Sequence, residues 1–412
     1  MHSLFLIRPA SVGDILFGQG RRLSYGAGMS IRLTAYEFFA GGGLAGLGLN
    51  GANPGGVSGI ETIFANDMDR AKAAAFTANH PRVPFHLGDV WALTTADLPG
   101  APDLAWASSP CQDVSLAGGR GGLTAGRSGA FWGFWRLIEG LSREGRAPGI
   151  IVLENVIGLL TSGAAQGEDF AAVCTAMAAG GWRIGALEMD AAHWLPQSRP
   201  RLFVVAMAEE IAAAAPQTRA PNGPFHSSRL IAAEARLPQA VRDAWTWWSL
   251  PVPSRRNLDL DALLEPDETA VWLDDGEAIL ALAAPLHRAR LEAAIASGRR
   301  TVGAAYRRVR RENGRKVQRL EIRFDGLAGC LRTPAGGSSR QYVVVCDGGR
   351  ARVRRLTGRE AARLMGVSDD YLLPPSQSAA LKLMGDAVAV PVVRALAEGL
   401  LKPALSARRA AA

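Results

Sequence analysis

The chain has 412 residues, 48% hydrophobic and 20% charged, which is typical of a globular protein long enough for a large core and two domains. Its net charge of +8 favours a polyanionic partner, above all nucleic acid, over an anionic membrane. The four cysteines form no Cys-x-x-Cys pair, and no apolar run is long enough for a signal peptide or a membrane span. We therefore expect a reducing, cytoplasmic setting, with no disulfide framework, metal or membrane.

Short apolar runs alternate with helical segments from residue 31 to about residue 210. The runs IRLTAYEFF, ETIFANDMD, DLAWASSP, GIIVLENV and RLFVVAM are typical of strands, and residues 70–79, 130–144 and 169–179 are typical of helices. Strands that alternate with helices form a parallel sheet covered on both faces. The sequence therefore predicts an α/β fold with a mostly parallel sheet.

The region 215–335 differs in character. It is rich in Pro, Trp and Arg, shows no sustained alternation of strands and helices, and includes a densely basic stretch at 299–323. It predicts a separate, smaller, irregular domain. Helical patterns return from residue 356, and the tail after Lys402 is expected to fray. Residues 1–28, before Met29, are expected to be an N-terminal extension of uncertain role.

A glycine-rich turn, Phe39-Ala40-Gly41-Gly42-Gly43, joins the first predicted strand to a helix. Glycines there let the backbone turn tightly and approach a ligand. Asp67 follows the second strand and can accept hydrogen bonds from ribose hydroxyls, while Asp89 follows the third and can accept one from an adenine amino group. Together they predict a nucleoside-cofactor pocket, the alternative being a simple tight turn.

Cys111 follows a predicted strand and lies between Pro110 and Gln112 in a loop of Ser, Gly and Ala. A thiol is a strong nucleophile even when only a few per cent is ionised. The alternative is a buried small hydrophobe, and the polar, glycine-rich surroundings make it the less favoured interpretation.

Glu154 and Asn155 end an apolar run, where a carboxyl group is rarely tolerated unless it is paired. A desolvated carboxyl group can hold and donate a proton at neutral pH; the alternative is a helix cap. Arg199 and Arg201 stand two positions apart before another strand, so alternation directs them to one face, where guanidinium groups can bind an oxygen-bearing ligand. A solvated edge would explain the arginines equally well if they stood alone.

These elements, in this order, resemble the DNA cytosine carbon-5 methyltransferase family. The motifs are PCQ with a following Ser115, then ENV, then PQSRPR, and near the C-terminus RRLTGREAARLMGVSDDY and LMGDAVAVPVV. The resemblance runs from Tyr36 to about Arg394, with 215–325 largely outside it. It implies a Rossmann-like catalytic and cofactor-binding domain at 29–214, a target-recognition domain at 215–370, and a C-terminal segment at 371–412 that returns to the catalytic domain.

The resemblance also implies roles for the catalytic residues. Cys111 would add to carbon 6 of cytosine, Glu154 would hold ring nitrogen 3, and Arg201 with Arg199 would support the base and the catalytic loop. Addition at carbon 6 makes carbon 5 nucleophilic toward the methyl group of S-adenosylmethionine. Since a base inside a duplex is unreachable, the cytosine would have to flip out.

The expected cofactor site follows from the same likeness. Phe39 would stack on the adenine of S-adenosylmethionine, Asp67 would lie at its ribose and Asp89 at its amino group. The full expected cofactor set is Phe39, Gly41, Gly43, Asp67, Asp89 and Asp386. Two positions depart from the family: Leu44 stands where a further glycine is frequent, and Asp386 stands where Asn is usual, which leaves the contact of Asp386 open.

Duplex DNA is the expected partner, contacted through arginines that neutralise phosphates. The residues expected at the substrate or DNA are Gln112, Ser115, Asn155, Gln197, Arg310, Arg332, Thr333 and Arg340. A solvated basic face is the alternative for the basic stretch. A monomer at the nucleoid is expected, and a cognate restriction endonuclease that acts separately is a further candidate partner.

Two other functions stay open. The same catalytic set occurs in a branch that methylates transfer RNA, but that branch typically carries a Cys-Phe-Thr motif that is absent here. A catalytically idle DNA-binding regulator of this fold is the second alternative, although Cys111, Glu154 and Arg201 are all present.

Overall fold

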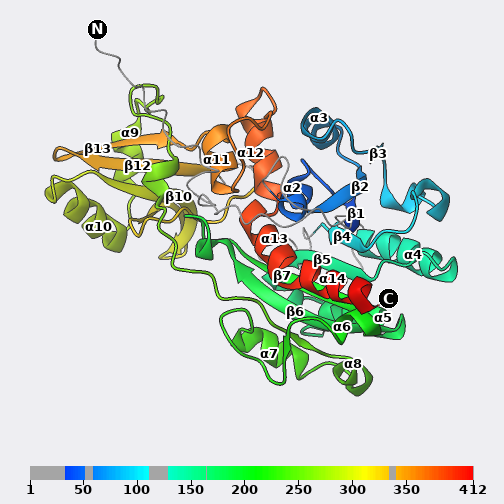
Figure 1. Cartoon of the computed structure of the whole chain (residues 1–412). Helices are drawn as coiled ribbons and strands as arrows, with labels where there is room; N and C mark the ends of the chain where they lie inside the picture. The colour runs from blue at the N-terminus through cyan, green and yellow to red at the C-terminus, as the bar shows by residue number, and fades with distance from the viewer. Residues whose placement is uncertain (1–32, 52–58, 111–128, 164, 334–339, 412) are drawn as a thin grey trace, which may run out of the picture. The chain divides into compact units, whose positions relative to one another are not determined.

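The structure, a computed structural model, describes residues 33–51, 59–110, 129–163, 165–333 and 340–411 (Figure 1). These residues form two compact units. The larger unit comprises the described residues within Ser30–His193, Arg199–Arg255 and Ala387–Ala412. The smaller unit comprises Trp194–Ser198 and the described residues within Arg256–Asp386.

A seven-stranded sheet in the order β3-β2-β1-β4-β5-β7-β6 forms the centre of the larger unit. Five strands pair in parallel: β1 (Leu33–Phe38), β2 (Ile60–Asp67), β3 (Phe85–Leu87), β4 (Leu104–Ser108) and β5 (Ile150–Val156). Strand β7 (Pro200–Ala208) runs antiparallel between β5 and β6 (Trp182–Asp190). The connection from β6 to β7 spans only 191–199, whereas a parallel crossover needs about a dozen residues or more. The predicted α/β class and mostly parallel sheet are confirmed.

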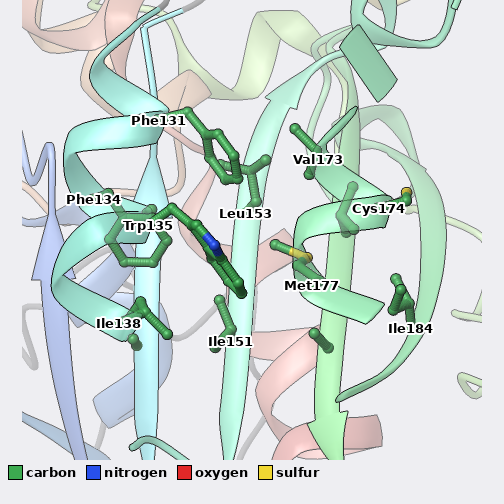
Figure 2. Packing of buried hydrophobic residues seen from close by; sticks show 14 of the residues in the cluster. Phe131, Phe134, Trp135, Ile138, Ile151, Leu153, Val173, Cys174, Met177 and Ile184 are labelled. Atoms are coloured by element: carbon green, nitrogen blue, oxygen red, sulfur yellow. The ribbon is translucent and has the colours of Figure 1, made fainter. Parts of the chain in front are cut away.

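Helices cover both faces of this sheet. On one face, α4 (Ala130–Arg143) and α5 (Glu168–Ala179) bury a row of aromatic and aliphatic side chains against β5 and β6 (Figure 2). Trp135 of α4 and Met177 of α5 belong to this cluster, because apolar residues recur there at helical spacing. On the opposite face, α2 (Leu44–Asn50) packs against α13 (Val390–Leu396) so closely that a Cβ on Gly48 would overlap Val393.

Shorter elements complete the larger unit. They are α3 (Arg70–Asn79), α6 (Glu209–Ala212), α7 (Ser228–Glu234), α8 (Gln239–Asp243), α14 (Lys402–Ala411), the strands β8 (Gln217–Thr218) and β9 (Trp247–Trp248), and the 3-10 turns Val90–Ala92, Thr95–Asp97, Ile157–Thr161 and Ala191–His193. The tail expected to fray is helix α14, held by the buried Ala404 and Leu405. The region after 215 also starts within this unit, since Trp248 donates a hydrogen bond from Nε1 to the Val205 carbonyl of β7 (3.0 Å).

The smaller unit contains a regular antiparallel sheet in the order β11-β10-β12-β13. Its strands are β10 (Thr301–Glu312), β11 (Arg315–Arg323), β12 (Gln341–Asp347) and β13 (Arg350–Arg355), and its helices are α9 (Gly276–Ala281), α10 (Pro285–Ala296), α11 (Gly358–Leu364) and α12 (Gln377–Asp386), with a 3-10 turn at Leu260–Leu263. Ile279 of α9 and Leu291 of α10 join Val344 and Val353 of the sheet in one core cluster. The smaller region expected beside the α/β domain is therefore present, and its sheet and helices form an ordered α+β arrangement.

None of the helices in the described ranges combines the length and apolar character that crossing a bilayer requires.

Candidate active site

The glycine loop after β1 adopts a left-handed backbone. The φ angles of Phe39, Gly41 and Gly43 are 57°, 57° and 81°. A Cβ on Gly43 would overlap the rings of His80 and Phe76, whereas the space beside Gly41 is open to 4 Å. A non-glycine residue at positive φ stores strain and is typical of functional sites. The loop therefore leaves open space beside Gly41, two residues after the strained Phe39.

Asp67 fixes this loop to the end of β2. Its Oδ2 accepts a hydrogen bond from the Gly41 amide (2.9 Å) and its Oδ1 accepts one from the Asp69 amide (2.9 Å). The side chain is largely buried. The carboxylate that was expected at a ribose thus lies directly against the glycine loop.

Exposed apolar side chains flank this end of the sheet. Met68 is 68% exposed, Leu87 47% and Trp91 49%, which is unusual for large hydrophobic residues. Asp89 lies among them and accepts a hydrogen bond from the Trp91 amide (3.0 Å). Glycine loop, two carboxylates and exposed apolar surface fit an adenosyl group, whose polar ribose and flat purine need these partners.

A buried acid that the sequence interpretation did not single out lies behind the loop. Glu37 of β1 is 1% exposed, and its Oε2 accepts a hydrogen bond from the Gly46 amide of α2 (3.1 Å). Burial raises the pKa of this carboxyl group to about 8. The signal was available in the sequence as an acid inside the otherwise apolar run LTAYEFF.

Glu154 and Arg201 meet on neighbouring strands. Arg201 of β7 pairs in register with Val156 of β5, and its Nε lies 3.2 Å from Oε1 of Glu154. Both side chains are nearly buried, at 14% and 8% exposure. The strand-end acid and one arginine of the PQSRPR motif therefore form an ion pair within the larger unit.

The chain that leads to Cys111 leaves the sheet beside Glu154. Ser108, the last residue of β4, pairs in register with Glu154 of β5. The next residue, Ser109, is buried and accepts a hydrogen bond at its hydroxyl from Nδ2 of Asn155 (3.2 Å). Asn155 therefore ties the ends of β4 and β5 together.

Three of the predicted site residues, Cys111, Gln112 and Ser115, lie outside the described residues. Two of the other thiols are poor nucleophiles: burial raises the pKa of Cys174 far above neutrality and that of Cys346 to about 11. Cys330 is half-buried in the smaller unit, where its Sγ lies 3.5 Å from the Leu331 carbonyl.

Arg199, which alternation was expected to direct to the same face as Arg201, is buried and bonded within the protein. It is 1% exposed, its amide donates to Oδ1 of Asp190 (2.7 Å), and its Nη2 donates to the Ala387 carbonyl (2.5 Å). Its guanidinium group thereby anchors the segment that enters α13.

Gln197 is also buried, within the smaller unit. Its Oε1 accepts a hydrogen bond from the Leu331 amide (3.1 Å), and its Nε2 donates to the Leu364 carbonyl (2.6 Å). The Gln197 side chain has no exposed surface, and its amide group forms hydrogen bonds with the protein itself.

The remaining predicted DNA contacts also lie in the smaller unit. Thr333 donates its hydroxyl hydrogen bond to Asp386, and a Cβ on Gly385 would lie only 2.6 Å from the backbone of Arg332. Arg340 donates to the Ser378 hydroxyl (2.8 Å). Asp386, expected at the cofactor, thus has Thr333 as a partner in its own unit.

A mostly parallel sheet with a glycine loop after its first strand and an acid after its second is the architecture of an enzyme that binds a nucleoside cofactor. The family model for C-5 cytosine-specific DNA methylases matches residues 33–402. The chain belongs to this family and is an S-adenosylmethionine-dependent DNA cytosine-5 methyltransferase.

Individual relatives agree with this assignment. The Type II methyltransferase M.NgoBI of Neisseria gonorrhoeae is 27% identical over 85% of this chain and 90% of its own length. The Type II methyltransferase M.HaeII of Haemophilus aegyptius is 24% identical over 83% and 86%.

Solved structures show the same fold. The Entamoeba histolytica methyltransferase EhMeth matches with a TM-score of 0.55 and 12% identity, over 89% of this chain and 97% of that one. The methyltransferase Dnmt2 of S. pombe matches with a TM-score of 0.52 and 17% identity, over 89% and 97%.

Proposed function

We propose that this enzyme methylates carbon 5 of a cytosine flipped out of a specific duplex DNA sequence, through a covalent adduct with Cys111. The observation that carries the proposal is the register of β4 with β5, in which Ser108 pairs with Glu154. Because of this register, the segment entering Pro110-Cys111-Gln112 starts next to the Glu154–Arg201 pair.

The reaction follows from these side chains. The Cys111 thiolate adds to carbon 6, while the Glu154 carboxyl group donates a hydrogen bond to ring nitrogen 3 and gives it a proton that returns when the adduct breaks, so that charge does not accumulate on the ring. Carbon 5 then carries the electron pair that takes the methyl group. Loss of the carbon 5 proton to a base re-forms the double bond and expels the Cys111 sulfur. Arg201, ion-paired with Glu154, holds that carboxyl group in position.

Phe39, Gly41, Asp67 and Asp89 would hold S-adenosylmethionine, which supplies an electrophilic methyl group on a sulfonium when bound. Asp67 would exchange its contact with the Gly41 amide for ribose hydroxyls, or share it with them. The exposed Met68 would cover the purine.

The curated relatives are named as Type II methyltransferases, and we infer a Type II modification role beside a separate restriction endonuclease. A monomer suffices, because one active site extrudes one base. A DNA substrate places such an enzyme at the nucleoid.

Trapping on a duplex with 5-fluorocytosine tests the mechanism, because fluorine at carbon 5 cannot leave as a proton. The unsubstituted chain should form a covalent adduct when S-adenosylmethionine is present, and Cys111→Ala should form none while still binding the duplex. Cys330→Ala is the matched control and should be trapped normally. Methyl transfer by Cys111→Ala would contradict the nucleophile, and transfer to transfer RNA in place of DNA would favour the RNA alternative.

A further inference from the structure

Strands β10 and β11 extend beyond the sheet of the smaller unit. β10 pairs with β12 only over Thr301–Tyr306, whereas its pairing with β11 continues to Glu312 opposite Arg315. Residues 307–312 and 315–320 therefore form a two-stranded ribbon, which at about 3.4 Å per residue reaches about 20 Å. Asn313 and Gly314 close it with φ angles of 49° and 76°, as a tight two-residue hairpin turn requires.

The ribbon has two faces that differ in charge pairing. Residues opposite one another in an antiparallel pair point to the same face. The register defines the residues of each face. One face, which we call the paired face, carries Arg308, Arg310, Glu312, Arg315, Val317 and Arg319. The opposite face, which we call the open face, carries Arg307, Val309, Arg311, Lys316, Gln318 and Leu320.

Carboxylates offset the arginines of the paired face. Nε of Arg319 lies 2.7 Å from Oε1 of Glu312, and Nε of Arg310 lies 2.8 Å from Oε1 of Glu321, which shares this face through its pairing with Tyr306. A phosphate backbone that approached here would have to displace or repel these carboxylates.

The open face holds no carboxylate. Arg311, Lys316 and Gln318 are exposed, and none has an ion pair or hydrogen bond from its side chain to another described residue. Val309 between them is 54% exposed. At the base of this face, the guanidinium of Arg307 stacks over the Tyr342 ring at 5.6 Å, and Leu320 is buried.

We propose that the open face of the ribbon enters the major groove of duplex DNA and reads part of the target sequence. This rests on the proposed function only in taking duplex DNA as the substrate. The major groove, about 12 Å wide, admits a two-stranded ribbon, while the deep, narrow groove of duplex RNA does not. Arg311 and Lys316 suit phosphates or guanine, Gln318 suits the paired donor and acceptor of adenine, and Val309 suits a thymine methyl group.

The experiment compares two matched double variants of the full chain, Arg311→Ala/Lys316→Ala on the open face and Arg308→Ala/Arg319→Ala on the paired face. Each removes two exposed or half-exposed cations from the same ribbon. Binding to unmethylated plasmid DNA is measured across salt concentrations. The open-face double should lower the slope of log affinity against log salt by about 2, because each phosphate contact contributes about 0.9. Its affinity should fall about tenfold or more, and the paired-face double should stay within about threefold of the parent. Equal losses in both, or a larger loss on the paired face, would overturn the proposal.

A second variant tests base reading. Bisulfite sequencing of DNA methylated by Gln318→Ala should show a target sequence relaxed at one base pair, whereas Gln239→Ala, on helix α8, should keep the parental sequence. An unchanged target sequence with Gln318→Ala would remove that residue from base reading. If the parent chain transfers no methyl group yet the open-face double loses binding, the proposed reaction fails while the ribbon proposal stands. Preference for duplex RNA over duplex DNA would contradict the ribbon proposal.

Discussion

Nε of Arg201 and Oε1 of Glu154 lie 3.2 Å apart on adjacent antiparallel strands, in a position where neither charge is well solvated. Removing one partner of a nearly buried pair leaves the other charge desolvated, which is more disruptive than the loss of an exposed ion pair. The Glu154–Arg201 ion pair therefore affects both the stability of this end of the sheet and the proposed chemistry.

Glu154→Gln tests the proton-holding role. The amide keeps the shape and can still accept from Arg201, but it cannot share a proton with the base, so the rate of methyl transfer should fall by about 10²–10⁴-fold with little loss of DNA binding. Radiolabelled methyl transfer and duplex binding measure the two effects. Glu168→Gln, at the exposed start of α5, should behave as the parent. A near-parental rate in Glu154→Gln would remove the residue from the reaction.

Asp67→Ala tests the cofactor pocket. It removes the acceptor of the Gly41 amide and of the expected ribose contact, so affinity for S-adenosylmethionine should weaken by about 1–3 kcal/mol, measured by calorimetry. Asp69→Ala is the control. It removes the cap that accepts from Ala71 and Lys72, and should lower stability by about 1 kcal/mol without changing cofactor affinity. Equal cofactor affinities in the two variants would move the ribose contact elsewhere.

Glu37 predicts a pH dependence of stability. Its pKa is about 8 in the folded chain and near 4.5 when unfolded, so the folded state binds the proton more tightly. The free energy of unfolding should therefore fall as pH rises from about 4.5 through 8, by an amount on the order of a few kcal/mol. Glu37→Gln should flatten this dependence, which thermal unfolding between pH 5 and 9 would reveal. A parental pH profile in Glu37→Gln would assign the titration to another group.

Gln197→Leu tests the interior role of that glutamine. The change leaves the Leu331 amide and the Leu364 carbonyl without their buried partner, so stability should fall by about 1–3 kcal/mol for each group in chemical denaturation. Gln318→Leu, on the exposed ribbon, should change stability by less than about 0.5 kcal/mol. Unchanged stability with selectively weaker DNA binding would instead support the predicted substrate contact.

Local pattern was sufficient for the glycine loop and its acid. A strand, a glycine turn and a helix are specified within 33–50, and Asp67 ends the next apolar run, so the contact between Asp67 and Gly41 follows from adjacent parallel strands. Strand β6 was missed, and with it the reversal of β7, because the direction of β7 is set by the short link between them.

The parts of the fold and site that the sequence did not predict depend on pairing between distant segments. β10 pairs with β12, although β11 and residues 324–340 separate the two strands in the sequence. No local periodicity predicts this register. The turn signal Asn313-Gly314 between two strand-like runs was available and predicts the β10–β11 hairpin. The interior positions of Gln197 and Arg199 could not be inferred, because their partners Leu364 and Ala387 lie far along the chain.

The five residues Trp194–Ser198 belong to one unit and the residues on either side of them to the other. A chimera that replaces only residues 256–386 with those of a relative would therefore keep Trp194–Ser198 native. It would nevertheless replace Leu331 and Leu364, whose backbone groups bind Gln197. A functional chimera should need both pieces from the same donor, so the transferable module of this enzyme is discontinuous in its gene.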